Sequence, residues 1–396
     1  MSCRLPGEFM VGPMSRHGVL SIAGLVFLIG VSAMQAHAAG LADLGRQLYF
    51  DVNLSRNRTQ SCATCHAPEH GFVDTRGIGV LAAVSRGDDG HSVGDRNAPT
   101  AAYARFSPAF HRAADGRFVG GQFLDGREPD LAGQAGGPPL NPIEMGMPDK
   151  AAVVARLREN PAYVAAFERH FGAGIWSDVD EAYAAMAQSI AAFEQTDFFA
   201  PFDSRYDRYL RGEYEMTAQE DLGMTLFFSQ QFTNCNLCHQ LRPRPAMEGE
   251  TFSNYEYHNI GTPENVALRK VNGVADNFVD TGLLANPAVD DPGQAGRFKV
   301  PTLRNVAVTG PYMHNGVFED LRTVVLFYNK YNSRSAKRQV NPETGQRWAD
   351  PEVPANLSEQ ELKTGPALDD RRIDALVAFM KTLTDRRYEH LLDSTR

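Results

Sequence analysis

Cys62-Ala-Thr-Cys65-His66 and Cys235-Asn-Leu-Cys238-His239 are two copies of one five-residue pattern, and they decide how the rest of the sequence is interpreted. The copies lie about one domain apart, and each follows a short stretch with helical spacing. Four of the five cysteines fall in these two patterns, and the fifth, Cys3, lies near the N-terminus. We therefore expect two related halves, each organised around one copy.

The pattern Cys-x-x-Cys-His is the signature of c-type haem attachment. Its spacing places two thiols under the two vinyl groups of one porphyrin, with the histidine below the iron as an axial ligand. A zinc site would need both cysteine pairs to converge on one metal. A redox dithiol does not require the histidine, and structural disulfides are the remaining alternative. The sequence favours two covalently bound haem c groups, with His66 and His239 as proximal ligands.

The N-terminus has the features of a signal peptide. Arg4 and Arg16 precede a short apolar run that ends at Ala36-His37-Ala38, a small-x-small cleavage site. The run is too short for a typical membrane span, so we expect residues 1–38 to be removed and the protein to reach the periplasm with no membrane span. The formal net charge is −9, with no basic run, which argues against nucleic-acid binding.

Helical spacing dominates the remaining chain, and strand-like alternation is scarce. A capping box, Thr217-Ala-Gln-Glu220, precedes one apolar run. The segments expected to be helical are 41–51, 149–160, 161–172, 177–196, 217–230, 319–331 and a last helix around residues 373–380. Two Gly/Pro-rich stretches, 78–99 and 115–148, read as long ordered loops, and residues 203–214 as a hinge.

The other face of each iron decides between electron transfer and catalysis, because a closed haem carries electrons and an open one reacts. From the residues alone, Tyr328 is more typical of a half-buried core tyrosine, and Glu144 of a surface charge. His91 lies in a polar loop and is more typical of a solvated histidine. Weaker candidate ligands are Met145, Met147, Met313, His70, His258 and His314.

Several further motifs, in order along the mature chain, resemble the bacterial di-haem cytochrome c peroxidases and their relative MauG. They are Arg96-Asn-Ala-Pro-Thr100, Asp125-Gly-Arg127, Leu140-Asn-Pro-Ile-Glu-Met145, Phe298-Lys-Val-Pro-Thr-Leu-Arg-Asn305, Pro311-Tyr-Met-His-Asn-Gly316 and Phe327-Tyr-Asn329. The resemblance implies an all-α fold of two cytochrome-c-like haem domains packed together, with long ordered loops and little strand. The domains expected are 39–210, the peroxidatic half, and 211–396, the electron-transfer half.

In the family, the N-terminal haem reacts with hydrogen peroxide beneath a glutamine, a proline and a glutamate. These match Gln134, Pro138 and Glu144, which makes Glu144 the expected proton shuttle. The distal ligand of the C-terminal haem is methionine in the peroxidases proper and tyrosine in MauG, and Tyr328 falls at that position. The resemblance also implies a calcium ion between the haem domains.

The calcium ligands in the family are an asparagine side chain and two backbone carbonyls, which match Asn97, Thr309 and Pro311. Oxygen ligands of this kind suit a hard cation. One departure concerns the loop between the haems, where the family usually has a tryptophan and this chain has Leu124. A second concerns His91, whose register with the loop histidine that closes the peroxide haem of the classical peroxidases is not secure.

Three functions follow from the resemblance. The first is a MauG-like oxidoreductase that uses hydrogen peroxide, through high-valent haem iron, to oxidise a periplasmic partner protein. The second is a cytochrome c peroxidase that receives electrons from a small cytochrome c or a cupredoxin. The third is a non-enzymatic di-haem electron carrier, which would need both haems closed. Tyr328 favours the first function, whereas Leu124 weakens the first more than the second.

Overall fold

The computed structural model describes residues 40–393 of the chain. The expected signal peptide, residues 1–38, lies outside the described residues. Within residues 40–393, none of the helices has both the length and the apolar character needed to cross a membrane.

The described chain is mainly helical, as the sequence predicts. Residues 40–49 form the first helix. The other α-helices are α2 (Cys62–Cys65), α3 (Leu131–Ala135), α4 (Lys150–Arg158), α5 (Pro161–Phe171), α6 (Val179–Glu194), α7 (Arg205–Leu210), α8 (Ala218–Phe227), α9 (Val266–Arg269), α10 (Leu321–Asn329), α11 (Glu359–Leu362) and α12 (Asp370–Thr382). Short 3-10 helices interrupt the loops, among them η3 (Gly79–Ala83), η4 (Ala104–Phe106), η5 (Pro138–Leu140), η7 (Cys235–Leu237), η10 (Val306–Val308) and η12 (Arg386–Leu391).

Strands are short and few in the described residues. They are β1 (His111–Arg112), β2 (Phe118–Val119), β3 (Tyr257–His258) and β4 (Phe298–Lys299). The first two pair antiparallel, and so do the last two. The long loops therefore obtain their order from side-chain and backbone hydrogen bonds rather than from a sheet.

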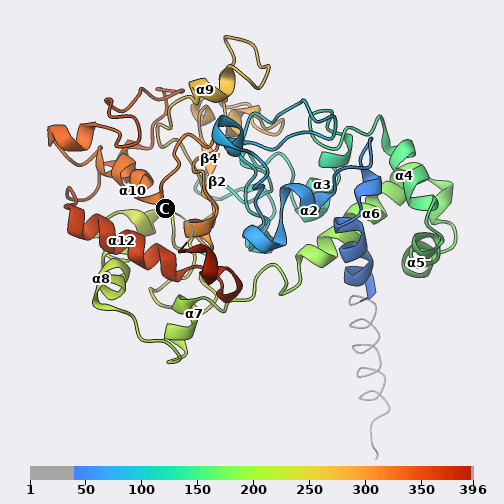
Figure 1. Cartoon of the computed structure of the whole chain (residues 1–396), viewed down its shortest axis with the longest axis horizontal. Helices are drawn as coiled ribbons and strands as arrows, with labels where there is room; N and C mark the ends of the chain where they lie inside the picture. Colours follow the sequence, from blue (N-terminus) through green and yellow to red (C-terminus); the bar gives the residue numbers. More distant parts are fainter. Residues whose placement is uncertain (1–39, 394–396) are drawn as a thin grey trace, which may run out of the picture. The chain divides into compact units, whose positions relative to one another are not determined.

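Two helix crossings have the same construction. Gly45 in the first helix faces α6 so closely that a Cβ there would lie 1.8 Å from the Ser189 carbonyl oxygen. Gly223 in α8 faces α12 in the same way, with 1.9 Å to the Ala375 carbonyl oxygen. Figure 1 shows α8 and α12 lying across one another. Glycine is the one residue that lets two helix backbones approach this closely, so both crossings depend on it.

The apolar core is divided along the sequence. One cluster draws its buried residues from 44–200, including the aromatic rings of Phe193 and Phe199. A second draws them from 206–383, including Phe227, Phe252 and Phe379. Each cluster contains one of the two helix crossings, so each cysteine pattern has a hydrophobic core of its own beside it.

The expected hinge, residues 203–214, is more ordered than its composition suggests. It contains α7, and Asp207 within it is 4% exposed. Arg304, which is fully buried, donates to both carboxylate oxygens of Asp207, over 2.6 and 2.9 Å. A bidentate pair of this kind fixes geometry, so the segment is anchored in the second core.

Candidate functional site

Each cysteine pattern forms a single tight turn. In the first, α2 is capped by Ser61 and Thr64, and the His66 amide donates to the Cys62 carbonyl over 2.9 Å. In the second, η7 turns in the same sense, and the His239 amide donates to the Cys235 carbonyl over 2.9 Å. The turn places both thiols and the histidine of each pattern close together.

The two histidine rings have equivalent partners. His66 Nδ1 lies 3.2 Å from the Phe72 carbonyl oxygen, and His239 Nδ1 lies 3.0 Å from the Phe252 carbonyl oxygen. Both phenylalanines adopt left-handed backbone angles, with φ of 58° and 56°, which is rare for residues other than glycine. A carbonyl at Nδ1 fixes the ring and leaves Nε2 available for a metal.

The loops that carry these carbonyls are held by equivalent threonines. Thr100 Oγ1 donates to the Gly71 carbonyl over 2.6 Å, one residue before Phe72. Thr302 Oγ1 donates to the Thr251 carbonyl over 2.7 Å, one residue before Phe252. The internal repeat thus extends beyond the cysteine patterns to the segments that follow Pro99 and Pro301.

The four cysteines fit a covalently attached haem. All four are free thiols. Burial raises the pKa of Cys65 to about 11 and that of Cys238 to about 12. Burial also lowers the pKa of His239 to about 4 and lowers that of His66. Neutral thiols beside a neutral imidazole, in apolar surroundings, suit thioether attachment and iron ligation.

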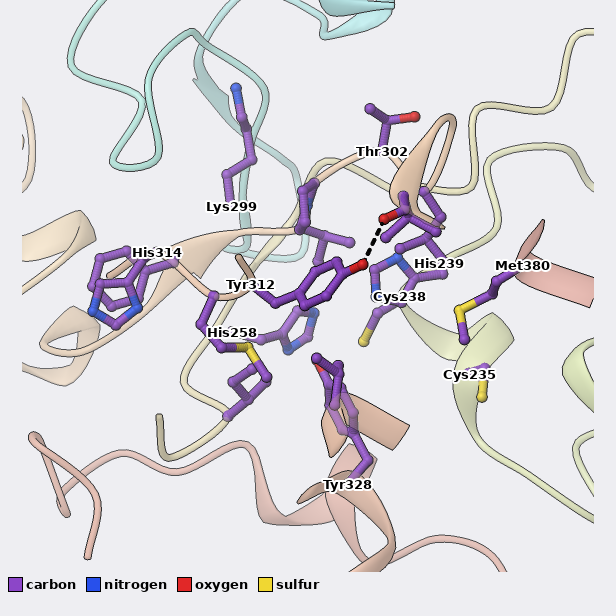
Figure 2. A pocket seen from close by; sticks show the side chains of 18 of the residues that line it. Cys235, Cys238, His239, His258, Lys299, Thr302, Tyr312, His314, Tyr328 and Met380 are labelled. Atoms are coloured by element: carbon purple, nitrogen blue, oxygen red, sulfur yellow. Dashed lines mark hydrogen bonds between the residues drawn. The ribbon is translucent and has the colours of Figure 1, made fainter. Parts of the chain in front are cut away.

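A cavity of about 350 Å³ lies beside the second pattern. Cys235, Cys238, His239 and Tyr328 line it, and its wall is mostly apolar. Tyr328 comes from α10, and Figure 2 shows its side chain and that of His239 pointing into the same space. Burial, and then the thiols of Cys238 and Cys235, raise the pKa of Tyr328. The structure therefore brings together all four residues expected around the second haem.

The three expected calcium ligands lie along the same cavity. Asn97, Thr309 and Pro311 all contribute to its lining. The Asn97 side-chain amide donates to the Pro311 carbonyl, and the Asn97 backbone amide donates to the His314 carbonyl over 2.7 Å. Among residues 40–393, no group of three or more His, Cys, Asp or Glu side chains is arranged to hold a metal ion. Any ion here would thus depend on amide and carbonyl oxygens.

Glu144 lies in the first half, in the turn after η5. Burial raises its pKa, and the nearby Arg127 opposes that shift. Its charge also acts on Cys65, so Glu144 lies near the first cysteine pattern. Gln134 is in α3, and the Pro138 carbonyl accepts the amide that follows Glu144 in sequence, over 3.2 Å. Of the three residues, Glu144 is the one that the structure shows near the first pattern.

The remaining candidate ligands divide into four groups. His91 is exposed, and its backbone amide donates to Asp89 over 2.9 Å. Met145 and Met147 are core residues of the first half. Met313, His258 and His314 line the cavity of the second half, where His314 stacks on Phe298. His70 is half-buried at the end of η2 (Pro68–His70).

Leu124 lines the same cavity, next to Phe123. The guanidinium of Arg127 lies 3.6 Å from the centre of the Phe123 ring. Trp176 packs on Phe167 in the first core, and Trp348 packs on Phe327 behind α10. Neither tryptophan is part of the described lining, so an aromatic side chain other than tryptophan would have to fill the role usual at this position.

One buried carboxylate escaped the sequence analysis. Asp385 accepts from the Tyr103 hydroxyl at one oxygen, over 2.5 Å, and from the Asn305 side-chain amide at the other, over 2.9 Å. Tyr103 and Asn305 occupy equivalent places, each just before a 3-10 helix and each with left-handed φ, 60° and 63°. The signal that could have found them is the shared Pro-Thr that precedes each by the same spacing.

Comparisons with known proteins agree with this arrangement. The model of the di-haem cytochrome c peroxidase family, CCP_MauG, matches residues 39–215. The chain is 56% identical over 379 residues to methylamine utilization protein MauG of Paracoccus denitrificans (strain Pd 1222), covering 95% of this chain and 97% of that protein. It is 33% identical over 291 residues to cytochrome c peroxidase Ccp of Escherichia coli (strain K12), covering 73% and 52%. The crystal structure of the diheme peroxidase BthA from Burkholderia thailandensis E264 matches with a TM-score of 0.76 and 33% identity, covering 88% and 86%.

Proposed function

Because the chain belongs to the di-haem cytochrome c peroxidase family, which includes MauG, we propose that it is a di-haem oxidoreductase that uses hydrogen peroxide to oxidise a partner protein. The observation that carries the proposal is Tyr328, which shares one cavity with Cys235, Cys238 and His239. A phenolate oxygen is a hard donor and stabilises oxidised iron better than a thioether does.

The family implies two c-type haems, one for each cysteine pattern. We propose that Cys62, Cys65 and His66 hold the first and that Cys235, Cys238 and His239 hold the second. Bound haem supplies peroxide activation and the high-valent iron that amino-acid side chains lack. The backbone carbonyls at the two Nδ1 atoms orient the rings and make each imidazole a better donor.

Glu144 is the proposed proton shuttle of the first half. Burial raises the pKa of its carboxyl, which brings it closer to the pH at which it exchanges protons readily. With haem bound, Glu144 would accept a proton from one oxygen of hydrogen peroxide and return it to the other, which could then leave as water. Gln134 orients the peroxide through its amide, and Pro138 contributes an apolar wall that limits the entry of water. The exposed position of His91 supports an open first haem at rest.

The test of this function is a Tyr328→Met variant of the holoprotein. It should lose the long-lived oxidised state after peroxide addition and keep some peroxide turnover, as followed by optical spectroscopy. Tyr331→Phe is the matched control, because Tyr331 lies three residues after Tyr328 and donates its hydroxyl to the Ile260 carbonyl over 2.9 Å. An unchanged Tyr328→Met spectrum would remove Tyr328 as a ligand.

A second candidate function is supported by Leu124, which lines the cavity where the family usually has a tryptophan. Slow charge sharing between the haems would suit a peroxidase that receives electrons from a small cytochrome c or a cupredoxin. Mass spectrometry of co-purifying proteins before and after peroxide separates the two functions. A newly oxidised tryptophan or tyrosine on a partner supports the first, and turnover with reduced cytochrome alone supports the second.

We propose a calcium ion held by Asn97, Thr309 and Pro311. The contact between the Asn97 amide and the Pro311 carbonyl supports it, because a half-turn of the amide would present oxygen in place of nitrogen. Removal of calcium with a chelator should change the spectra of the haems, and calcium should restore them. The Asn97→Ala variant is the control. Its spectra should not respond to chelator or calcium, whereas those of the native protein should.

The domain boundaries and location also remain proposals. The separate apolar clusters of residues 44–200 and 206–383 support haem domains at 39–210 and 211–396. A signal peptide at 1–38 and cleavage after Ala38 would deliver the protein to the periplasm, where its protein partner would meet it. N-terminal sequencing of the protein purified from a periplasmic extract tests both the cleavage and the location.

A further inference from the structure

Communication between the two halves needs a side chain that can be oxidised, and Leu124 cannot serve. The cavity wall contains other aromatic side chains, including Tyr103, Tyr255 and Tyr312. Phenol is far easier to oxidise than the benzene ring of Phe123 when its proton can leave at the same time. A relay between the halves therefore requires a tyrosine whose hydroxyl contacts a proton acceptor.

The hydroxyl groups of these tyrosines differ in what they can do with a proton. Tyr312 donates to the Val306 carbonyl over 3.0 Å, and a carbonyl cannot hold the proton at ordinary pH. The buried Tyr255 hydroxyl has no hydrogen-bond partner in the described structure. Tyr103 donates to the Asp385 carboxylate over 2.5 Å. Of the three, Tyr103 has a base in direct contact.

Tyr103 also contacts both halves: its backbone amide donates to the Phe199 carbonyl over 3.1 Å, and its hydroxyl donates to Asp385. It is fully buried and contributes to the cavity that His239 lines. It follows Pro99, whose carbonyl acts on the pKa of His66. The Phe202 amide donates to the Tyr103 oxygen over 3.2 Å, so the phenol oxygen keeps a hydrogen bond after it loses its proton. This remaining hydrogen bond favours reversible oxidation of Tyr103, because the phenol oxygen stays in a defined position.

The equivalent residue of the second half shows that structure alone does not require a phenol. Asn305 makes the matching hydrogen bond to the other oxygen of Asp385. An amide is therefore sufficient to hold this carboxylate in place. Tyrosine at position 103 adds a group that can be oxidised, and it does so in the half that contains the proposed peroxide site.

We propose that Tyr103 is a redox relay between the two haem sites, with Asp385 as its proton acceptor. The inference rests on the proposed function, because the oxidant is the first haem after it has reacted with hydrogen peroxide. In the forward step Tyr103 gives one electron to that haem and its hydroxyl proton to Asp385, leaving a neutral tyrosyl radical and a neutral carboxylic acid. In the return step the second haem gives one electron to the radical, and the proton passes back from Asp385 to the phenol oxygen.

The surrounding charges favour this coupled transfer. The Arg304 guanidinium lies 5.4 Å from the Tyr103 ring centre, so loss of an electron without the proton would place two positive charges together in a buried site. Transfer of the proton to Asp385 avoids that state. Burial raises the pKa of Asp385 to about 6, which makes it a better proton acceptor than an exposed aspartate.

The test mixes holoprotein containing ring-deuterated tyrosine with hydrogen peroxide, followed by rapid freezing and electron paramagnetic resonance. The variants are Tyr103→Phe, Asp385→Asn and the matched control Tyr255→Phe. Native and Tyr255→Phe protein should give a radical whose hyperfine pattern changes with deuteration, and Tyr103→Phe should lose it. In Asp385→Asn the radical should form about 100-fold more slowly, because a positioned base contributes at least that much. Optical stopped-flow should show oxidation of the second haem slowed in both relay variants.

The outcomes separate the relay from the function beneath it. If peroxide reacts normally with the first haem but native protein gives no tyrosyl radical, the relay alone is overturned. The same holds if Tyr103→Phe oxidises its second haem at the native rate. If peroxide leaves the first haem of native protein unchanged, the proposed function fails and the relay fails with it. Should Tyr103→Phe not fold, Asp385→Asn decides the matter, because it retains the phenol and removes only the base.

Discussion

The two halves hold His66 and His239 in the same way, through a phenylalanine carbonyl at Nδ1, but the two phenylalanines are supported by different parts of the chain. Behind Phe252, the guanidinium of Arg304 lies 5.4 Å from the ring centre, fully buried within the same half. Behind Phe72, the guanidinium of Arg387 lies 5.1 Å from the ring centre, and it comes from η12 at the far end of the chain. Phe252 is therefore supported by an arginine of its own half, whereas Phe72 is supported by the strap, η12 (Arg386–Leu391), which belongs to the other half.

The difference continues around the cysteines. Glu194 and Met380 each directly follow a phenylalanine at the helix crossing of their half. A Cβ added to Gly45 would lie 3.1 Å from the Phe193 Cβ, and one added to Gly223 would lie 2.8 Å from the Phe379 Cβ. Met380 lines the cavity beside the second cysteine pattern. In the first half, the charge of Glu194 adds to burial in raising the pKa of Cys62. The two halves therefore share the same kind of helix crossing. They differ in the side chain at the equivalent position, which is Glu194 in the first half and Met380 in the second.

The largest expected effect concerns Glu144, the proposed proton shuttle of the first half. Glu144→Gln should slow the reaction of the first haem with peroxide by about 100- to 10,000-fold, because a positioned acid/base contributes that much. Stopped-flow spectroscopy at varied peroxide concentration measures it. Glu69→Gln, an exposed glutamate of the same half, should react at the native rate. A native rate in Glu144→Gln would mean that the two halves do not differ in the way proposed.

The next largest effect compares Arg304 and Arg387, the arginines behind Phe252 and Phe72, by their contribution to stability. Arg304→Met should lower the free energy of unfolding by about 3–5 kcal/mol, because it leaves the buried Asp207 carboxylate uncompensated. Arg387→Met should cost about 1 kcal/mol, since it removes one hydrogen bond, to the Phe198 carbonyl over 2.7 Å. Urea unfolding measures both. Adding Asp207→Asn to Arg304→Met should recover part of the loss, and equal losses in the two single variants would contradict the comparison.

A third prediction concerns pH. Burial raises the pKa of Glu194 from 4.5 to about 8. The folded protein therefore binds a proton that the unfolded chain releases, so this residue lowers stability as pH rises from about 4.5 through 8. Glu194→Met, which copies the second half, should remove up to roughly 5 kcal/mol of that decline. Urea unfolding across this pH range measures it, and the exposed Glu168→Gln should keep the native slope. A native slope in Glu194→Met would show that Glu194 ionises as an ordinary carboxyl.

The smallest effect tests a second contact of the strap, which Tyr388 of η12 makes with the first half. Tyr388 donates its hydroxyl to the Pro68 carbonyl over 2.6 Å, two residues after His66. Tyr388→Phe should cost about 1 kcal/mol and shift the reduction potential of the first haem while leaving that of the second. Tyr331→Phe removes a similar bond to a carbonyl in the second half and should spare the first haem. A shift of both potentials in Tyr388→Phe would show that the halves are not independently supported.

Local patterns in the sequence predicted the helices well. The capping box at Thr217 and Glu220 is present, and the expected helix at 177–196 forms from Val179 to Glu194. The all-α fold with little strand is confirmed by the structure and by the match to the diheme peroxidase BthA. These features depend on capping and on periodic burial, which neighbouring residues determine.

Contacts between distant residues were not accessible from the pattern. The hinge expected at 203–214 holds a buried helix because Arg304 reaches Asp207 from far along the chain. The shared Pro-Thr marks Tyr103 and Asn305 as equivalent, but no local signal connects either residue with the distant Asp385. Glu194 did carry a signal, since it falls one turn after Ile190 on the apolar face of its helix.

The strap has a consequence for the order in which the molecule is completed. Tyr388 and Pro68 are 320 residues apart, and contacts of such separation close late because the intervening chain must already be arranged. Synthesis proceeds from the N-terminus, so the loop that follows His66 lacks this hydrogen bond until Tyr388 has emerged. The loop that follows His66 therefore obtains its hydrogen bond from Tyr388 only after both cysteine patterns have been synthesised.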